Sequence, residues 1–148
     1  GYVGGVDRMS TITSPAVLWM KTRTGRDNCL NLNWYRNAHF HKLNKAKKAY
    51  KAIMKESIIA LPGYDKVTIH YKYYLRQKCD MGNVHSIVEK FFLDALVEFG
   101  KLPDDNCEIV SSDSKEFVEY NREDPHCVIE ITALDEYGNK LNLVEVTK

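Results

Sequence analysis

Residues 66–76 alternate between two sets of side chains, and this alternation constrains the fold more than any other feature of the sequence. Five apolar or aromatic side chains share one face, namely Val67, Ile69, Tyr71, Tyr73 and Leu75. The other face carries Thr68, His70, Lys72 and Tyr74. A period of two residues is typical of a β-strand with one buried face. The sequence therefore predicts such a strand here.

Helical spacing replaces this alternation on both sides of the strand. Apolar residues recur every three or four positions from about His41 to Ala60, and Pro62-Gly63 ends that helix. A second helix is predicted from about Asn83 to Phe99. Gly100 follows it, at the position where helices favour a left-handed residue.

The remaining segments predict shorter elements. Strands are expected at 16–21, 29–34, 107–110, 127–134 and 141–146, and residues 111–125 are expected to be a polar, acidic loop or weakly ordered stretch. Residues 1–8, ahead of Met9, are expected to be an expression scar or disordered, which leaves 9–148 as a single domain. The approximate order β-β-α-β-α-β-β predicts an α+β (mixed α/β) fold in a single domain, in which a mixed β-sheet packs against two main helices.

Charge is segregated along the chain, although the formal net charge is only +1. Residues 1–93 hold 16 Lys and Arg against 6 Asp and Glu, whereas residues 94–148 hold 5 against 14. This division favours one surface that attracts a polyanion and another that is rich in acids, although an ordinary solvated surface can also be lopsided.

Two classes of protein are disfavoured. The four cysteines, at 29, 79, 107 and 127, form no C-x-x-C pair, which argues against a disulfide framework or a zinc site. No run of about 18 apolar residues is present, which argues against a membrane span. The first residues lack the charged-then-apolar pattern of a signal peptide, so we expect a cytoplasmic protein.

A set of acidic and polar residues is the strongest indication of chemistry. It comprises Asp80 at the junction of strand and helix, Asn83, Lys90 and Asp94 on one helical stripe, and Asp104 and Asp105 after the helix. Carboxylates are hard ligands suited to Mg²⁺ or Mn²⁺, and such ions activate phosphodiesters. The helix is about 25 Å long, so these acids converge only if the following loop folds back along it.

Each of these residues also has a purely structural interpretation. Asp80 could cap the helix N-terminus. Lys90 and Asp94 could form a surface ion pair. Asp104 and Asp105 could belong to a simple turn. Spacing alone leaves these alternatives open.

This segment resembles the RusA-type endodeoxyribonucleases, the Holliday junction resolvases often carried by phages and prophages. That family's pattern is Asp-x-Asp-Asn at a helix start, a Lys, Asp-Ala-Leu four residues later, and Asp-Asp ten residues beyond. Asp80 and Asn83 match the head of the pattern, Lys90 the lysine, and Asp94 the Asp-Ala-Leu motif, while Asp104 and Asp105 keep the family spacing. The match covers about 35 of the 148 residues.

Two departures from the family pattern concern the metal site. Gly82 stands where the family has its second Asp, and the stretch from Asn83 to Lys90 is about four residues longer than in the family. Either another carboxylate, Glu89 or Asp94, compensates for the missing ligand, or the metal site is impaired.

The resemblance implies a Mg²⁺-dependent (or Mn²⁺-dependent) endonuclease that nicks opposing strands of four-way DNA junctions in recombination and repair. Its catalytic residues would be Asp80, Lys90, Asp94 and Asp105, with Asp80, Asp94, Asp104 and Asp105 as metal ligands and Asn83 in support. Two cuts from one acidic cluster per chain imply a C2 homodimer. The alternatives are a junction-binding protein that no longer cuts, or a nuclease for other branched DNA.

A cationic surface is predicted around the first helix and the segments that flank it. The candidate DNA contacts are Arg23, Arg26, Arg36, Lys47, Lys48, Lys51, Lys55, Arg76 and Lys78. Such residues bind phosphates and make affinity fall with salt, although a solvated helix face is the equal alternative. The histidines at 70, 85 and 126 show no metal-ligand spacing.

Overall fold

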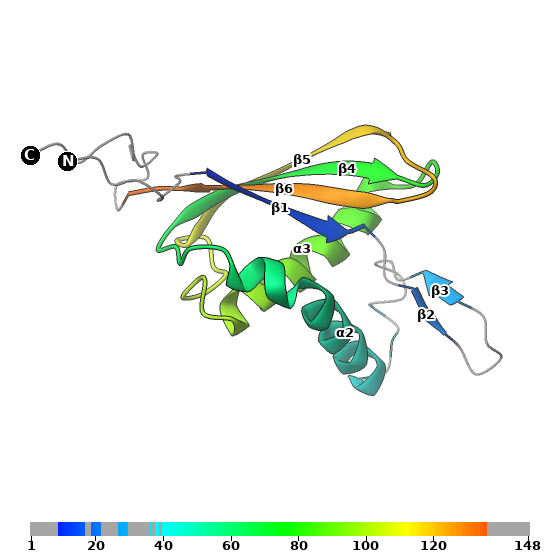
Figure 1. The fold of residues 1–148 in the computed structure, drawn as a ribbon, viewed down its shortest axis with the longest axis horizontal. Helices are drawn as coiled ribbons and strands as arrows, with labels where there is room; N and C mark the ends of the chain where they lie inside the picture. The colour runs from blue at the N-terminus through cyan, green and yellow to red at the C-terminus, as the bar shows by residue number, and fades with distance from the viewer. Residues whose placement is uncertain are drawn as a thin grey trace, which may run out of the picture.

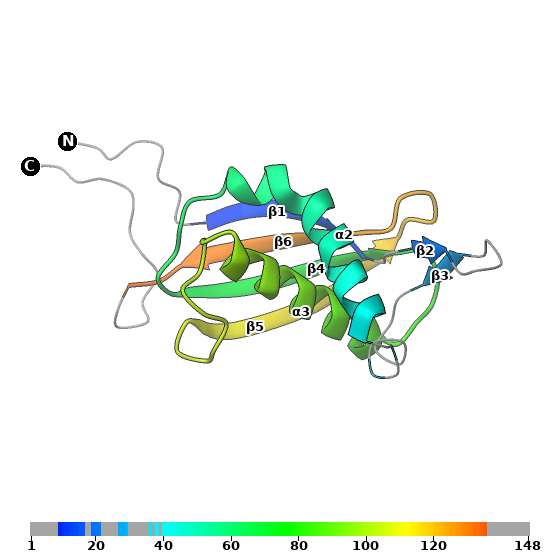
Figure 2. The ribbon, with the colours of Figure 1, turned by 90° about the horizontal axis from the view of Figure 1, so that it is seen from below.

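A computed structural model describes residues 9–16, 19–21, 27–29, 36, 38 and 40–135. They form two layers, a four-stranded sheet and two helices, α2 and α3, that both lie on one face of it (Figures 1 and 2). The strands of this sheet are β1 (Met9–Pro15), β4 (Val67–Leu75), β5 (Val110–Tyr120) and β6 (His126–Ala133). The helices are α2 (Phe40–Ile59) and α3 (Met81–Glu98). The predicted α+β fold is confirmed, and the order of elements matches roughly.

Strand β4 confirms the alternation in the sequence. Every second residue from Val67 to Leu75 is buried against the helices, and the residues between them are half-buried on the other face. Tyr71 and Tyr73 are fully buried. We call the sheet face that α2 and α3 leave uncovered the open face.

The sheet has the strand order β1-β6-β4-β5 and mixed strand directions. β6 pairs antiparallel with β1 and with β4, whereas β5 pairs parallel with β4. Parallel neighbours need a crossover connection, and α3 supplies it between β4 and β5. This crossover places β5 at an edge of the sheet, with α3 above it and above β4 (Figure 2).

The prediction for residues 107–125 is wrong. Residues 107–109 form a turn rather than a strand, and the stretch predicted to be a loop holds the 11-residue strand β5. Each residue of β5 after Val110 is exposed, because β5 is an edge strand with a polar sequence. It therefore shows none of the hydrophobic alternation from which strands are predicted.

The N-terminal strands also differ from the prediction. β1, at Met9–Pro15, was not predicted, and the described parts of the region of the first two predicted strands form a separate two-stranded ribbon of β2 (Trp19–Lys21) and β3 (Asp27–Cys29). The predicted strand at 127–134 is confirmed as β6. Residues 1–8, 30–34 and the predicted strand at 141–146 lie outside the described residues.

The two helices begin and end close to the predicted positions. α2 buries Ala46, Tyr50, Met54 and Ile58 in the core. After α3, Gly100 has a φ of 75°, and the N–H of Lys101 donates to the carbonyl of Leu96 over 2.8 Å. This closure needs a left-handed residue, which explains the glycine. In the part of the chain that the structure describes, neither helix has the length and apolarity that crossing a bilayer requires.

Candidate metal site

Asp80 caps helix α3. Its Oδ1 accepts a hydrogen bond from the backbone N–H of Gly82 over 2.8 Å, and its backbone carbonyl accepts from the N–H of Asn83. A Cβ at position 82 would lie 3.2 Å from Asp80 Oδ1, a tight contact. The glycine at the family's second Asp position therefore fits the capping geometry.

Asp94 is held by a cation from the neighbouring helix. Lys51 Nζ of α2 lies 2.9 Å from Asp94 Oδ2 and 2.7 Å from Glu98 Oε1. Although desolvation lowers the pKa of Lys51, hydrogen bonds to Glu98 and Asp94 outweigh it and raise the pKa. Asp94 thus ties α3 to α2, and Lys51 is engaged in this contact.

Asp104 and Asp105 lie in an exposed turn beyond the C-terminal end of α3. Asp104 accepts hydrogen bonds from the backbone N–H of Asp105 over 2.7 Å and from the side chain of Asn106 over 3.1 Å. The first of these bonds is the main cause of the lowered pKa of Asp104. A helix of 18 residues separates this turn from Asp80, at about 1.5 Å per residue.

The structure therefore does not gather the carboxylates that the sequence analysis expected to share a metal ion. A different set of side chains could hold a metal ion in the described part of the chain. It consists of His85, Glu89 and Asp113, whose potential ligand atoms all lie within 4.8 Å of one another. The loop after α3 does not fold back to bring Asp104 and Asp105 to Asp80. The geometric part of the expectation for Asp80, Asp94, Asp104 and Asp105 is thus corrected, and their structural interpretations describe what is seen.

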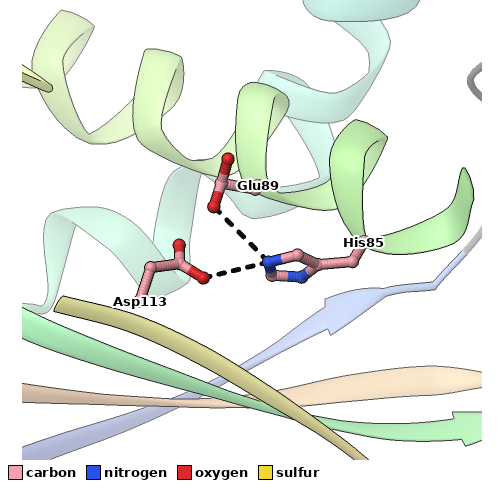
Figure 3. A group of neighbouring side chains, drawn as sticks. All are labelled: His85, Glu89 and Asp113. Carbon is pink, nitrogen blue, oxygen red and sulfur yellow. Dashed lines mark hydrogen bonds and ion pairs between the residues drawn. The ribbon is translucent and has the colours of Figure 1, made fainter. Parts of the chain in front are cut away.

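The group of His85, Glu89 and Asp113 lies between α3 and β5 (Figure 3). His85 and Glu89 are four residues apart, so they share one face of α3. Asp113 is opposite Ile69 in the β4–β5 register and points to the helix layer. His85 Nε2 lies 3.0 Å from Asp113 Oδ1 and 3.4 Å from Glu89 Oε2. The three side chains are 10%, 33% and 23% exposed, in the order His85, Glu89, Asp113.

Tyr73 orients the His85 ring from below. Its hydroxyl lies 2.7 Å from His85 Nδ1, and burial raises the Tyr73 pKa far above its usual range. The hydroxyl therefore stays protonated and can donate to Nδ1. Nε2 is then left facing the two carboxylates, so the orientation of the imidazole is fixed by a buried partner.

The two carboxyl groups of the site have opposite pKa shifts. A hydrogen bond with Asp113, then desolvation and the Asp113 charge, raise the pKa of Glu89 to about 7. Desolvation raises the pKa of Asp113, but hydrogen bonds from His85 and Glu89 outweigh it and lower the pKa. Glu89 thus keeps its proton up to near neutral pH beside an ionised Asp113, because two close carboxylates do not both ionise easily.

This donor set could hold a metal ion. One imidazole nitrogen and two carboxylates from two elements converge on one point, and three protein ligands leave coordination positions for water or substrate. The expectation that His85 has no ligand spacing is corrected by this geometry. Glu89, one of the two carboxylates considered as a replacement for the family's missing ligand, does lie in the group. The His-x-x-x-Glu spacing on a predicted helix was the available signal for the pair.

Only some of the residues predicted to contact DNA lie together on one element, helix α2. Lys48 and Lys55 are exposed on α2, Lys47 is half-buried there, and Lys51 pairs with α3. Arg36 is exposed ahead of α2. Arg23 and Arg26 lie outside the described residues.

A second set of basic residues lies close to the metal-binding group along the chain. Arg76 and Lys78 are exposed in the connection from β4 to α3, and Lys90 is exposed beside Glu89. No protein-family model matches the chain, and no curated protein matches its sequence. The resemblance to RusA-type resolvases stays a prediction.

Proposed function

We propose that the chain is a divalent-metal-dependent endodeoxyribonuclease that acts on branched DNA, with four-way junctions as its substrate class. The observation that carries this proposal is the group of His85, Glu89 and Asp113, at the same end of α3 as the exposed Arg76 and Lys78. An anionic site close to cationic side chains suits a phosphodiester, because the cations attract the backbone while the site retains a metal ion.

The residues of the chain would divide the work. A divalent ion at such a site supplies Lewis-acid chemistry, since it lowers the pKa of bound water and stabilises charge on phosphate oxygens. His85, Glu89 and Asp113 would hold the ion, and Tyr73 would keep the His85 ring in place. Lys90 follows Glu89 in the sequence, lowers its pKa by its charge, and could contact a phosphate.

Phosphate contacts along α2 would bind the arms of a junction without reading their sequence. The exposed cations of the helix are Lys42, Lys45, Lys48 and Lys55. The N-terminal ends of α2 and α3 lie toward the same end of the molecule (Figures 1 and 2). A duplex arm bound along α2 could therefore extend toward the metal-binding group.

The proposal includes a homodimer. One chain offers one such group in its described part, and paired nicks in opposing strands need two. A C2 dimer supplies two equivalent sites related by the symmetry of the junction itself.

A second candidate is a junction-binding protein that does not cut. The capping role of Asp80, together with Gly82 in place of the family's second Asp, favours it. Such a protein would keep the cationic residues and bind branched DNA equally well with and without metal.

The test uses a synthetic four-way junction labelled on each strand, incubated with Mg²⁺, Mn²⁺ or Zn²⁺. Paired nicks should appear, and Glu89→Gln or Asp113→Asn should lower the rate by at least about 100-fold, because even outer-shell partners contribute about 10- to 100-fold. Glu116→Gln is the matched control, since Glu116 is on the same strand but bonds His70.

Three other outcomes are informative. Junction binding without cleavage under any metal would select the second candidate. Faster cleavage of flaps or forks would keep the chemistry and change the substrate. Nicking that survives Asp113→Asn but is lost in Asp80→Asn or Asp105→Asn would mean that the acids of the sequence motif, rather than Asp113, form the catalytic site.

A further inference from the structure

The hydroxyl of Tyr71 stands out among the buried tyrosines. Tyr71 is fully buried on β4, and its hydroxyl oxygen has no hydrogen-bond partner among the described residues. The other buried tyrosines are all paired: Tyr50 with Ser14, Tyr64 with Ser10, and Tyr73 with His85. A buried hydroxyl without a partner is rare in folded proteins and calls for an explanation.

Tyr71 lies next to the metal-binding group. Its ring packs edge-on against the His85 ring, with centroids 4.7 Å apart, and stacks on Tyr73 at 6.5 Å. The Tyr71 ring thus lies against the metal-binding group, while its hydroxyl is hydrogen-bonded to neither carboxylate of that group.

We propose that His85, Glu89 and Asp113 bind a first-row transition-metal dication, Mn²⁺ or Zn²⁺ in preference to Mg²⁺, and that the Tyr71 hydroxyl hydrogen-bonds a water molecule on that ion. This inference deepens the proposed function, because it concerns the same site. It makes Tyr71 a positioning residue, which acts on the substrate only through the water.

The chemistry of the donors sets the metal preference. Imidazole nitrogen suits Zn²⁺ and its neighbours in the first row, whereas Mg²⁺ prefers oxygen ligands in strict octahedral geometry. Mn²⁺ accepts both carboxylate and imidazole ligands. A site that includes the fixed imidazole of His85 therefore selects against Mg²⁺.

The buried partners of His85 also suit a metal ligand. An imidazole that binds metal through Nε2 carries its proton on Nδ1 and donates it to an outer-shell acceptor. The Tyr73 hydroxyl can accept this hydrogen bond from Nδ1, because it can donate its own proton to the sulfur of Cys127, with which it is also hydrogen-bonded. The same tyrosine thus supports both tautomers of His85.

A water on the ion would give the Tyr71 hydroxyl the partner that it lacks. Three protein ligands leave room for one or more waters on Mn²⁺ or Zn²⁺. A water beside the ion is a polar group with which this buried hydroxyl could form a hydrogen bond. The orphaned hydroxyl and the three converging donors are independent observations, and both point to the same ligand.

The experiment measures binding of MnCl₂, ZnCl₂ and MgCl₂ to the purified chain by calorimetry, without DNA. Mn²⁺ and Zn²⁺ should bind at least about 10-fold more tightly than Mg²⁺. Tyr71→Phe should weaken Mn²⁺ binding by about 3- to 10-fold while the melting temperature of the metal-free protein stays constant or rises, because an unpaired buried hydroxyl is removed. Mn²⁺ spectroscopy should register a change in the bound water.

Tyr64→Phe is the matched control. It removes a hydroxyl that is paired with Ser10 rather than one beside the site, so it should lower the melting temperature and leave Mn²⁺ binding unchanged. A purely structural role for Tyr71 would give the same pattern as Tyr64.

Three results would overturn the inference: equal affinity for Mg²⁺ and Mn²⁺, unchanged Mn²⁺ binding in Tyr71→Phe, or unchanged Mn²⁺ binding in Asp113→Asn. Because DNA is absent, this test is separate from the proposed function. Selective Mn²⁺ binding without nuclease activity would support the inferred metal site and reject the proposed enzyme. Cleavage with Mg²⁺ by a protein that shows no preference for Mn²⁺ would support the enzyme and reject the inferred metal preference.

Discussion

The N-terminal half of α3 directs Glu89 toward a second carboxylate on β5, whereas the C-terminal half directs Asp94 toward Lys51 on α2. The second arrangement lowers the free energy of the fold and needs no ligand. The first holds two acids together, and one of them keeps a proton near neutral pH. Like charges brought close are costly for stability alone, so such a pair marks a functional site more strongly than a count of acids does.

The largest expected difference between the two halves concerns metal binding. Asp113→Asn removes a ligand atom and should weaken Mn²⁺ binding by at least about 100-fold. Asp94→Asn makes the same chemical change in the other half and should leave binding within about twofold, because the carboxylate of Asp94 bonds Lys51. Calorimetry on both variants provides the measurement. Similar losses in both would mean that the two halves do not differ in function.

The next effect concerns the stability of the N-terminal half. Tyr73→Phe leaves His85 Nδ1 without its buried partner, which should cost about 1 to 2 kcal/mol of unfolding free energy. Urea denaturation measures it. Tyr120→Phe, at an exposed tyrosine of the edge strand, should change stability by less than about 0.5 kcal/mol. Equal effects would contradict the buried bond.

A smaller effect is expected in the pH dependence of the metal-free protein, with opposite signs for Glu89 and for Asp104 in the turn after α3. The raised pKa of Glu89, about 7 against 4.5, favours the protonated form in the fold, so its contribution to stability is present below pH 4.5 and is lost as the pH rises toward 7. The pKa of Asp104 is lowered from 3.8, so its contribution is present above pH 3.8 and is lost as the pH falls below it.

Carboxyl NMR shifts across a pH titration test both directions. In Asp113→Asn the Glu89 pKa should fall toward its usual value, because the main cause of the shift is removed. The Asp104 resonance should not respond to that variant. A Glu89 pKa that is insensitive to Asp113 would show that burial alone raises it.

The smallest effect is expected for the ion pairs of the C-terminal half. Lys51→Met should cost about 0.5 kcal/mol, since exposed ion pairs contribute about 0.2 to 1 kcal/mol. The difference in stability between wild type and variant should shrink as NaCl is added, because salt screens the ion pairs that Lys51 makes in the wild type. Urea melts at low and high salt measure the difference. A loss of several kcal/mol would mean that Lys51 supports the core rather than the surface.

The central elements could be predicted from the sequence because each carries its own periodicity. β4, α2 and α3 bury one face, so their residues repeat every two or three to four positions. β5 could not be found in this way, because it is held by backbone pairing with β4 and has no apolar face buried in the core. A strand that is held only by pairing with its neighbour cannot be predicted from its own sequence, and it is recognised once the position of that neighbour in the sheet is known.

The site was predictable only in part, for a related reason. His85 and Glu89 are four residues apart, and their spacing on a helix is a local signal. Asp113 is 28 residues from His85 and reaches it through the pairing of β5 with β4. Asp80, Asp94, Asp104 and Asp105 lie on a motif that is continuous in sequence, but the straight helix between them keeps its ends apart.

The pairing of β5 with β4 contains two irregularities, one between Val67 and Thr68 and one between Tyr73 and Tyr74. Each leaves one additional residue in β5, at Ser111 and at Val118, and the regular stretch between them contains Asp113. Side chains alternate between the two faces of a sheet, so a slip by a single position would turn Asp113 to the open face and place a serine beneath α3. A shift of the stretch 112–117 by one position against β4 would therefore disable the site while leaving every candidate ligand in the chain.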